Sequence, residues 1–269
     1  MGLTDQEFIR YSRSLMCSDA AEAQQLRLKH SSVLLLGLGG LGCPIATTLV
    51  GAGVGQLTLI DDDVVELSNL PRQPLYETAD IGKRKADVAA AKLHRHNPHP
   101  ILTVMPSRPD DAALANAIAD CDLVIDCSDN LPTRLQLNAL ARAARKPLFA
   151  AAVTADQAQL YLLAPDTACY QCLVDPDWQT LRNCQSLGVD TALVALTGQQ
   201  LALLVLRFLQ LGAEHQLPFG HYARYRNLSS AAPLHCGFQW YPLLANPTCP
   251  CCGSVAPAAV AAPLTAGTS

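Results

Sequence analysis

Four cysteines in two Cys-x-x-Cys pairs are the residues of this 269-residue sequence whose types and spacing most clearly imply chemistry. The pairs are Cys169 with Cys172 and Cys249 with Cys252, a spacing typical of a structural Zn²⁺ site. Four thiolates leave no coordination position for water or substrate, so we expect the ion to tie the C-terminal part of the chain to an earlier segment. The alternative is two unrelated cysteine pairs, or disulfides in an exported protein.

A glycine-rich loop is the second chemical element. The sequence Gly37-Leu38-Gly39-Gly40-Leu41-Gly42 satisfies GxGxxG between an expected strand and an expected helix. Such a loop lets backbone N–H groups approach a phosphate near a helix N-terminus. Asp61 follows the next expected strand, where a carboxylate accepts hydrogen bonds from ribose hydroxyls. Taken alone, these features suit an NAD-linked oxidoreductase, and the glycines alone can also form a simple packing turn.

Charged side chains then accumulate beyond what hydride transfer requires. They occur in the segments Asp61-Asp62-Asp63, Ser68-Asn69-Leu70-Pro71-Arg72, Lys83-Arg84-Lys85 and Cys127-Ser128-Asp129. A cleft lined by these segments would offer two cations to phosphates and at least one carboxylate to Mg²⁺. This combination favours a nucleoside triphosphate over a dinucleotide.

The elements that must position these residues follow an alternation of short apolar strands and helices. This alternation predicts an α/β fold with a doubly wound, Rossmann-like, mostly parallel sheet. Strands are expected at 33–36, 57–60, 101–105, 122–126 and 148–153. Helices are expected at 4–16, 19–29, 83–95, 110–119 and 131–144, with another from the glycine loop to about residue 50. Residues 157–163 are expected to pair antiparallel at the sheet edge and to begin a C-terminal extension.

Composition indicates which partners and which cellular compartment suit the protein. The net charge of −4 and the pI near 5.9 give no electrostatic basis for binding nucleic acid or an anionic membrane. The N-terminus has no apolar signal segment, which predicts a cytoplasmic protein with reduced cysteines. The apolar run 191–206 carries two glutamines in its middle, so we expect a buried helix at a subunit interface rather than a membrane span.

Three parts of the chain are expected. Residues 1–30 form an N-terminal helical segment, residues 31–253 form the α/β domain with the cysteine pairs, and residues 254–269 form a disordered tail. The tail is assigned because it lacks both charge and hydrophobic periodicity.

In this order and combination, the motifs resemble the ThiF/MoeB/HesA branch of the ubiquitin-activating-like adenylyltransferases, from about residue 4 to Gly253. The resemblance implies a homodimeric enzyme that uses Mg-ATP to adenylate the C-terminal glycine of a ubiquitin-like sulfur carrier protein and releases pyrophosphate. A role in thiamine thiazole biosynthesis and a role in activating the small subunit of molybdopterin synthase both stay open. The Arg-Asn-Cys sequence at Cys184 favours the thiamine role. A separate protein, such as a cysteine desulfurase, would supply the sulfur.

The same resemblance assigns roles to individual residues. Asp129 would hold Mg²⁺, Asp61 would bind the ribose, and Arg72 and Lys85 would contact the phosphates. The nucleotide-binding positions fall on Gly39, Gly40, Asp61, Ser68, Asn69, Arg72, Lys85, Ser128 and Asp129.

Two further residues receive catalytic roles from the resemblance. Arg13 matches an arginine that the partner subunit inserts into the site, and Cys184 resembles a loop cysteine that captures the activated carrier in an acyl-persulfide link. A carboxylate is already ionised at neutral pH, so its attack on the α-phosphate needs positioning and cations rather than a general base. The ordinary alternatives are solvated cations, a helix-capping Asp129 and a structural free cysteine. Other functions still open are the NAD-linked oxidoreductase and a non-catalytic zinc-bearing scaffold.

Overall fold

The computed structural model describes residues 2–105, 109–155, 157–173, 188–226 and 237–253. The α-helices are α1 (Asp5–Leu15), α2 (Ala21–His30), α3 (Gly42–Ala52), α4 (Lys85–His96), α5 (Asp111–Ala119), α6 (Leu131–Ala143) and α7 (Thr191–Leu211). The strands are β1 (Ser32–Leu36), β2 (Gln56–Ile60), β3 (Ile101–Met105), β4 (Leu123–Asp126), β5 (Leu148–Thr154), β6 (Gln157–Leu163), β7 (His221–Arg226) and β8 (Gln239–Pro242). Short 3₁₀ helices are η1 (Leu67–Arg72), η2 (Thr78–Asp80), η3 (Tyr170–Leu173) and η6 (Gly212–Glu214).

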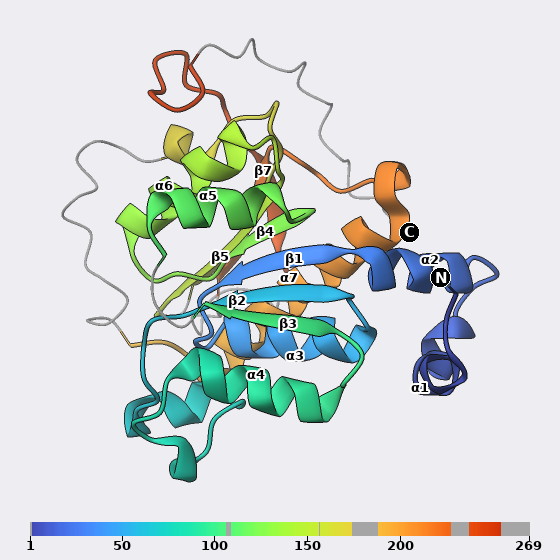
Figure 1. Ribbon diagram of the computed structural model, residues 1–269. Helices are drawn as coiled ribbons and strands as arrows, with labels where there is room; N and C mark the ends of the chain where they lie inside the picture. The colour runs from blue at the N-terminus through green and yellow to red at the C-terminus, as the bar shows by residue number, and fades with distance from the viewer. Residues whose placement is uncertain (1, 106–108, 156, 174–187, 227–236, 254–269) are drawn as a thin grey trace.

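Within the described residues, the strands form one eight-stranded sheet in the order β3-β2-β1-β4-β5-β6-β7-β8 (Figure 1). Strands β3, β2, β1, β4 and β5 are parallel, and β6, β7 and β8 continue the sheet in antiparallel pairs. The order reverses at β1, which has β2 on one side and β4 on the other. The predicted doubly wound fold with an antiparallel C-terminal extension is therefore confirmed.

One detail of that prediction is wrong, because β6 does not lie at the sheet edge. It pairs with β5, with Ala150 opposite Tyr161, but β7 pairs along its other side and β8 lies beyond β7. The physical reason is a long-range pairing, because β7, a strand that the local sequence patterns did not predict, aligns along the free edge of β6. Among the described strands, the edge on this side of the sheet is the four-residue β8, which ends in Pro242.

The two largest hydrophobic cores among the described residues flank the sheet. On one face, Val33 and Leu35 of β1 pack in a core with α3, α4 and α7. On the other face, Leu34 packs in a core with α5 and α6. Successive side chains of a strand point to opposite faces, so one continuously apolar strand serves both cores. Figure 1 shows the resulting layers, with α3 and α4 on one side of the sheet and α5 and α6 on the other.

The apolar run predicted to be a buried helix forms α7. Among the described helices, α7 alone is long and apolar enough to cross a membrane by length and composition, and half of that stretch is buried inside the fold. Gly198 allows close packing, because a Cβ there would lie 2.5 Å from Cγ of Pro44 on α3. The outer face carries Leu196 and Leu203, which are 45% and 49% exposed. α7 is thus a core helix with one apolar face left uncovered in the single chain.

The N-terminal helices join the fold at the amino end of β1. Thr4 and Glu7 form a capping box at the start of α1. Glu7 also pairs with Lys29 of α2 at 2.7 Å, and Tyr11 receives a hydrogen bond from the buried Asn97 after α4 at 2.9 Å. These contacts hold α1 beside α2 and against the α/β layers.

Candidate functional site

The glycine loop and Asp61 form one hydrogen-bonded unit. The Asp61 carboxylate accepts bonds from the backbone N–H groups of Leu38 at 2.6 Å and Asp63 at 2.9 Å. Burial raises the pKa of the Asp61 carboxyl, although these N–H donors and the charge of Lys85 oppose the rise. Asp61 therefore ties the glycine loop to the segment that follows β2.

The glycines of this loop have different structural roles. A Cβ on Gly42 would lie 1.9 Å from the carbonyl oxygen of Gly37, so the backbone crosses itself too closely for any side chain. A Cβ on Gly39 would meet only Nε2 of Gln73, at 3.5 Å. Gly42 is therefore needed to close the loop, whereas Gly39 leaves space above it for a ligand.

Lys85 is a buried cation beside this loop. It is the first residue of α4, its side chain is 6% exposed, and its Nζ lies 2.8 Å from Oδ2 of Asp63. Asp63 is 68% exposed, so a negatively charged ligand can compete with it for the ammonium. Arg72, at the end of η1, donates to the carbonyl oxygen of Ser68 at 2.8 Å.

Two buried amide oxygens fit a polar ligand. Oδ1 of Asn69 and Oε1 of Gln73 are buried and have no hydrogen-bond partner among the described residues. An unpaired buried acceptor costs about 1–3 kcal/mol, which a donor from a bound nucleotide can recover. Asn69 lies in η1 with Arg72, and Gln73 is the C-cap of that helix, so this observation supports a polar ligand beside the glycine loop.

Asp129 lies on the turn after β4. Asp126, the last residue of β4, accepts hydrogen bonds from both N and Oγ of Ser128, at 2.8 and 2.6 Å. Asn130, not Asp129, caps α6, because its side chain accepts from the N–H of Thr133. Asp129 is exposed, and an oxygen ligand of this kind suits Mg²⁺.

These segments meet because the parallel strands β1, β2 and β4 end at the same edge of the sheet. The distance from a Cβ built on a loop glycine to the nearest atom of another segment shows how closely the two segments approach. A Cβ on Gly37 would lie 2.7 Å from the carbonyl oxygen of Cys127, and one on Gly40 would lie 3.4 Å from that of Arg72. The structure thus brings the glycine loop, Asp61, the η1 segment, Lys85 and the Ser128–Asp129 turn together.

Two predicted site residues are not part of this arrangement. Arg13 is exposed on the last turn of α1, and α1 packs beside α2 at the amino end of β1, away from the carboxyl-end loops (Figure 1). Cys184 lies outside the described residues, as does the predicted tail 254–269. The predicted role of Arg13 would require a second chain, and the roles of Arg13 and Cys184 both stay predictions.

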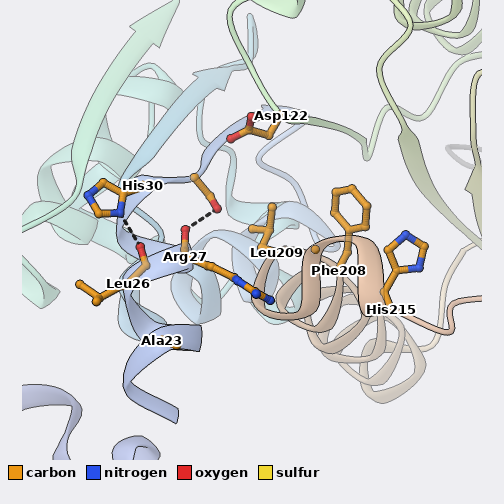
Figure 2. A pocket seen from close by; sticks show the side chains of 10 residues that line it. Ala23, Leu26, Arg27, His30, Asp122, Phe208, Leu209 and His215 are labelled. Atoms are coloured by element: carbon orange, nitrogen blue, oxygen red, sulfur yellow. Dashed lines mark hydrogen bonds between the residues drawn. The ribbon is translucent and has the colours of Figure 1, made fainter. Parts of the chain in front are cut away.

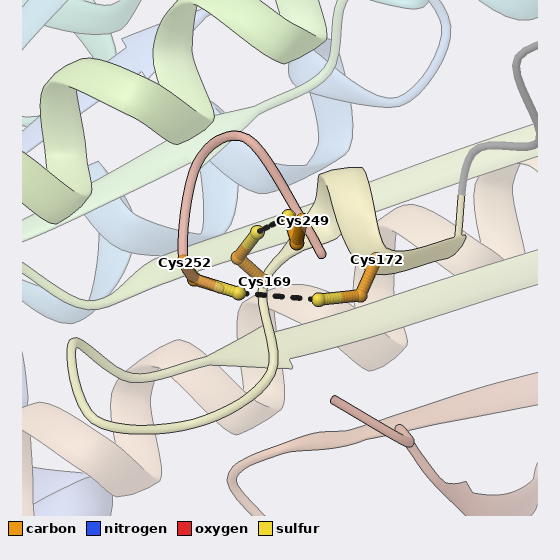
Figure 3. Close-up of side chains that lie close together, drawn as sticks. All are labelled: Cys169, Cys172, Cys249 and Cys252. Carbon is orange, nitrogen blue, oxygen red and sulfur yellow. Dashed lines mark hydrogen bonds between the residues drawn. The ribbon is translucent and has the colours of Figure 1, made fainter. Parts of the chain in front are cut away.

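The four predicted metal ligands converge on one point (Figure 3). Their Sγ atoms all lie within 4.8 Å of one another, with Cys169 to Cys249 at 3.7 Å and Cys172 to Cys252 at 3.2 Å. Tetrahedral Zn²⁺ with bonds of about 2.3 Å separates its sulfur ligands by roughly 3.8 Å, so the geometry fits this ion. Cys251 is outside the cluster, and its Sγ accepts a hydrogen bond from Asn138 at 3.2 Å.

Three residues of these sites were not assigned roles from the sequence. Asp63 pairs with Lys85, Gln73 contributes an unpaired oxygen, and Arg134 is buried behind the Ser128–Asp129 turn. The position of Gln73 directly after Arg72 was an available signal. Arg134 gives no such signal, since an arginine on a helix is ordinarily a surface residue.

A cavity of about 700 Å³ lies elsewhere, between α2 and the end of α7 (Figure 2). Its lining includes Arg27, His30, Asp122 and His215. His30 and Asp122 precede β1 and β4, so the cavity faces the amino ends of the strands, opposite the edge where α/β sheets bind nucleotides. Arg27 already donates to the carbonyl oxygen of Gln210 at 2.9 Å, and His30 already bonds that of Leu26 at 2.8 Å.

Comparison with known proteins gives the class of protein that this fold and site define. The ThiF family matches residues 11–251. The Sulfur carrier protein ThiS adenylyltransferase of Escherichia coli is 39% identical over 255 residues, which cover 93% of this chain and 97% of that protein. The Molybdopterin-synthase adenylyltransferase of Escherichia coli is 38% identical over 254 residues, covering 93% and 98%.

The chain belongs to the ThiF family, and the predicted resemblance is confirmed. A further relative, the Sulfur carrier protein adenylyltransferase of Thermus thermophilus, is 35% identical over 261 residues, which cover 94% of this chain and 93% of that protein. Among solved structures, Escherichia coli MccB with ATP superposes with a TM-score of 0.74, covering 91% of this chain and 73% of that chain. At 22% identity, that likeness concerns the fold.

Proposed function

We propose that this protein is an ATP-dependent adenylyltransferase that activates the C-terminal glycine of a ubiquitin-like sulfur carrier protein. A carboxylate oxygen of the carrier attacks the α-phosphorus of ATP, the new acyl–phosphate bond forms, and the bond to the β-phosphate breaks to release pyrophosphate. The carboxylate is already ionised, so the reaction needs cations and alignment rather than a base. The names of the relatives support this class of reaction.

The observation that carries the proposal is the buried Lys85 beside the glycine loop. A cation kept from water acts more strongly on phosphate charge than one on the surface. Arg72 would add a second cation, and Asp129 would hold Mg²⁺, which neutralises phosphate charge when bound. Asp61 would bind the ribose, and the glycine loop with Ser68, Asn69 and Ser128 would surround the phosphates.

Carrier-dependent exchange of pyrophosphate into ATP tests this assignment. We expect Arg72→Ala and Asp129→Ala to abolish the exchange while the variants keep the wild-type unfolding transition. Arg95→Ala is the matched control, because Arg95 is an exposed arginine on the last turn of α4. Exchange at the wild-type rate in either site variant would remove that residue from the proposed mechanism.

The carrier of the thiamine thiazole pathway is our first choice of substrate, and the molybdopterin synthase small subunit is the second. The two Escherichia coli relatives differ by one percentage point of identity and do not separate these choices. The Arg-Asn-Cys sequence at Cys184 supports the first. Exchange measured with each purified Gly-Gly carrier in turn identifies the substrate, and exchange with the molybdopterin carrier alone would reverse our choice.

Cys184 is proposed to capture the activated carrier. Its persulfide, loaded by a separate sulfur donor such as a cysteine desulfurase, would attack the acyl adenylate, form an acyl-persulfide and release AMP. Cys184→Ser should keep pyrophosphate exchange and lose an enzyme–carrier adduct that reductant cleaves. The same adduct in Cys184→Ser would show that another thiol carries it.

We also propose that the enzyme is a homodimer in which Arg13 completes the partner's site. The exposed apolar Leu196 and Leu203 of α7 support such an interface. Co-expressed Arg13→Ala and Asp129→Ala chains should form mixed dimers with one intact site and recover part of the exchange activity. Mixed dimers without activity would contradict the contribution from the partner.

A further inference from the structure

Arg134 of α6 is a buried guanidinium that anchors the turn carrying Asp129. The residue is 6% exposed, and its Nη2 donates to the carbonyl oxygens of Ser128 and, at 2.7 Å, Ala151 of β5. The carbonyl of Ser128 belongs to the peptide that leads into Asp129. Through these two bonds, the guanidinium links the backbone of that turn to β5.

The buried guanidinium of Arg134 is only partly satisfied by charged and hydrogen-bonding groups within the described residues. Burial opposes ionisation, but the nearby Asp126 carboxylate, which is 1% exposed, favours it, and the pKa of Arg134 is raised overall. Its Nη1 is buried without a hydrogen-bond partner among the described residues. The Tyr170 ring supplies a further contact, since Cζ of Arg134 lies 5.7 Å from the ring centroid. A desolvated contact of this kind contributes to holding the cation in place.

Tyr170 connects this guanidinium to the four-cysteine cluster, because it lies between the ligands Cys169 and Cys172. Its N–H donates to Oδ1 of Asn138 at 2.9 Å, and Nδ2 of Asn138 donates to Sγ of Cys251. Arg134 and Asn138 are four residues apart and share one face of α6. That face thus contacts the Ser128 turn and both cysteine-bearing segments.

We propose that Arg134 is a positioning residue that couples metal binding at the four-cysteine cluster to the geometry of the Ser128–Asp129 turn. Metal ligation fixes Cys169 and Cys172, and with them the Tyr170 ring on which the guanidinium lies. The inference rests on the proposed function, because the ligand at the turn is Mg-ATP. Coupling between two binding sites is reciprocal, so Mg-ATP should also tighten metal binding.

The test measures the zinc dissociation constant of the zinc-loaded protein by competition with a chelator, with and without Mg²⁺ and the non-cleavable analogue AMPCPP. We expect the nucleotide to tighten zinc binding about tenfold in the wild type, within the usual range of coupling between sites. Arg134→Met and Tyr170→Leu should reduce this factor to about one while leaving all four cysteine ligands in place. A purely structural role of Arg134 would change stability but not the response to nucleotide.

Arg142→Met is the matched control. Arg142 is also on α6, and its Nη1 donates to the carbonyl oxygen of Thr167, two residues before Cys169, at 2.9 Å. It holds the same cysteine-bearing segment and makes no hydrogen bond to the Ser128 turn within the described residues, so the coupling should persist in this variant. Loss of coupling in Arg142→Met equal to that in Arg134→Met would contradict a specific route through Arg134.

Calorimetry of AMPCPP binding to the same preparations separates the two hypotheses. If the wild type binds no nucleotide, the proposed function and the inference both fail. If it binds nucleotide and the zinc dissociation constant does not change, the inference alone fails. Should Arg134→Met not fold, Tyr170→Leu decides the matter, and full coupling in folded Tyr170→Leu would overturn the proposed route.

Discussion

Replacing Lys85 by methionine separates catalysis from stability at the predicted nucleotide site. Methionine keeps a long apolar chain in the space of the lysine stem and removes the charge. The ion pair lost is the one with Asp63, whose side chain is 68% exposed, so solvent screening keeps its contribution to folding at about 1 kcal/mol or less. The charge of Lys85 also favours ionised Asp61, and the loss of that interaction adds to the change in stability. The unfolding free energy of Lys85→Met should therefore stay within about 1.5 kcal/mol of the wild type.

The effect on catalysis should be much larger. A preorganised group that stabilises charge in the transition state accounts for about 10²–10³ in kcat, or about 2.7–4 kcal/mol. We expect carrier-dependent pyrophosphate exchange to fall by about a hundredfold or more in Lys85→Met. The assay is exchange under saturating ATP, and urea unfolding of the same protein reports stability.

Lys83→Met is the control for this experiment. Lys83 is two residues away and its side chain is 58% exposed, paired with Asp80 at 3.2 Å. This variant should change neither exchange nor stability by a measurable amount. Near-normal exchange in Lys85→Met, or an equal loss in Lys83→Met, would refute the argument from the buried cation.

Three other perturbations have distinct expected results. Gly39→Ala should fold normally but lose affinity for Mg-ATP in calorimetry. Gly42→Ala should lower the melting temperature sharply, because its Cβ would meet the Gly37 carbonyl oxygen. Equal behaviour of both variants would contradict the loop geometry. Cys172→Ser should leave the purified protein without zinc in elemental analysis, and Cys251→Ser should keep the metal. Burial works against ionisation of Glu7, but its bonds to Lys29 and Thr4 prevail and lower the carboxyl pKa. The ionised Glu7 carboxylate thus stabilises the fold at pH 7, and this stabilisation is lost as pH falls below about 4. The free energies of unfolding of Glu7→Gln and the wild type, measured by urea titration, should therefore converge in acid.

Local sequence patterns predicted the part of the fold that depends on local signals. The continuously apolar runs of β1 and β2 predict buried parallel strands, and the glycine loop between β1 and α3 follows from its spacing. The cysteine cluster was predicted because metal ligands must converge whatever path the chain takes between them.

Features that depend on distant segments were not predictable in this way. β7 has the mostly polar sequence HYARYR, which gives no local sign that Ala223 is fully buried. Its pairing with β6 joins segments far apart in the sequence. Arg134 becomes buried only when β5 and the Tyr170 segment pack against α6. No pattern within one helix indicates that burial.

The short last strand also affects how the protein behaves in a crowded solution. An exposed strand edge offers unpaired N–H and carbonyl groups to strands of other molecules. β8 limits this recruitment, because it has four residues and ends in Pro242, which has no N–H to donate. At the opposite edge, Pro100 directly precedes β3. Prolines at both margins of the sheet should therefore hinder its growth into strand-paired aggregates.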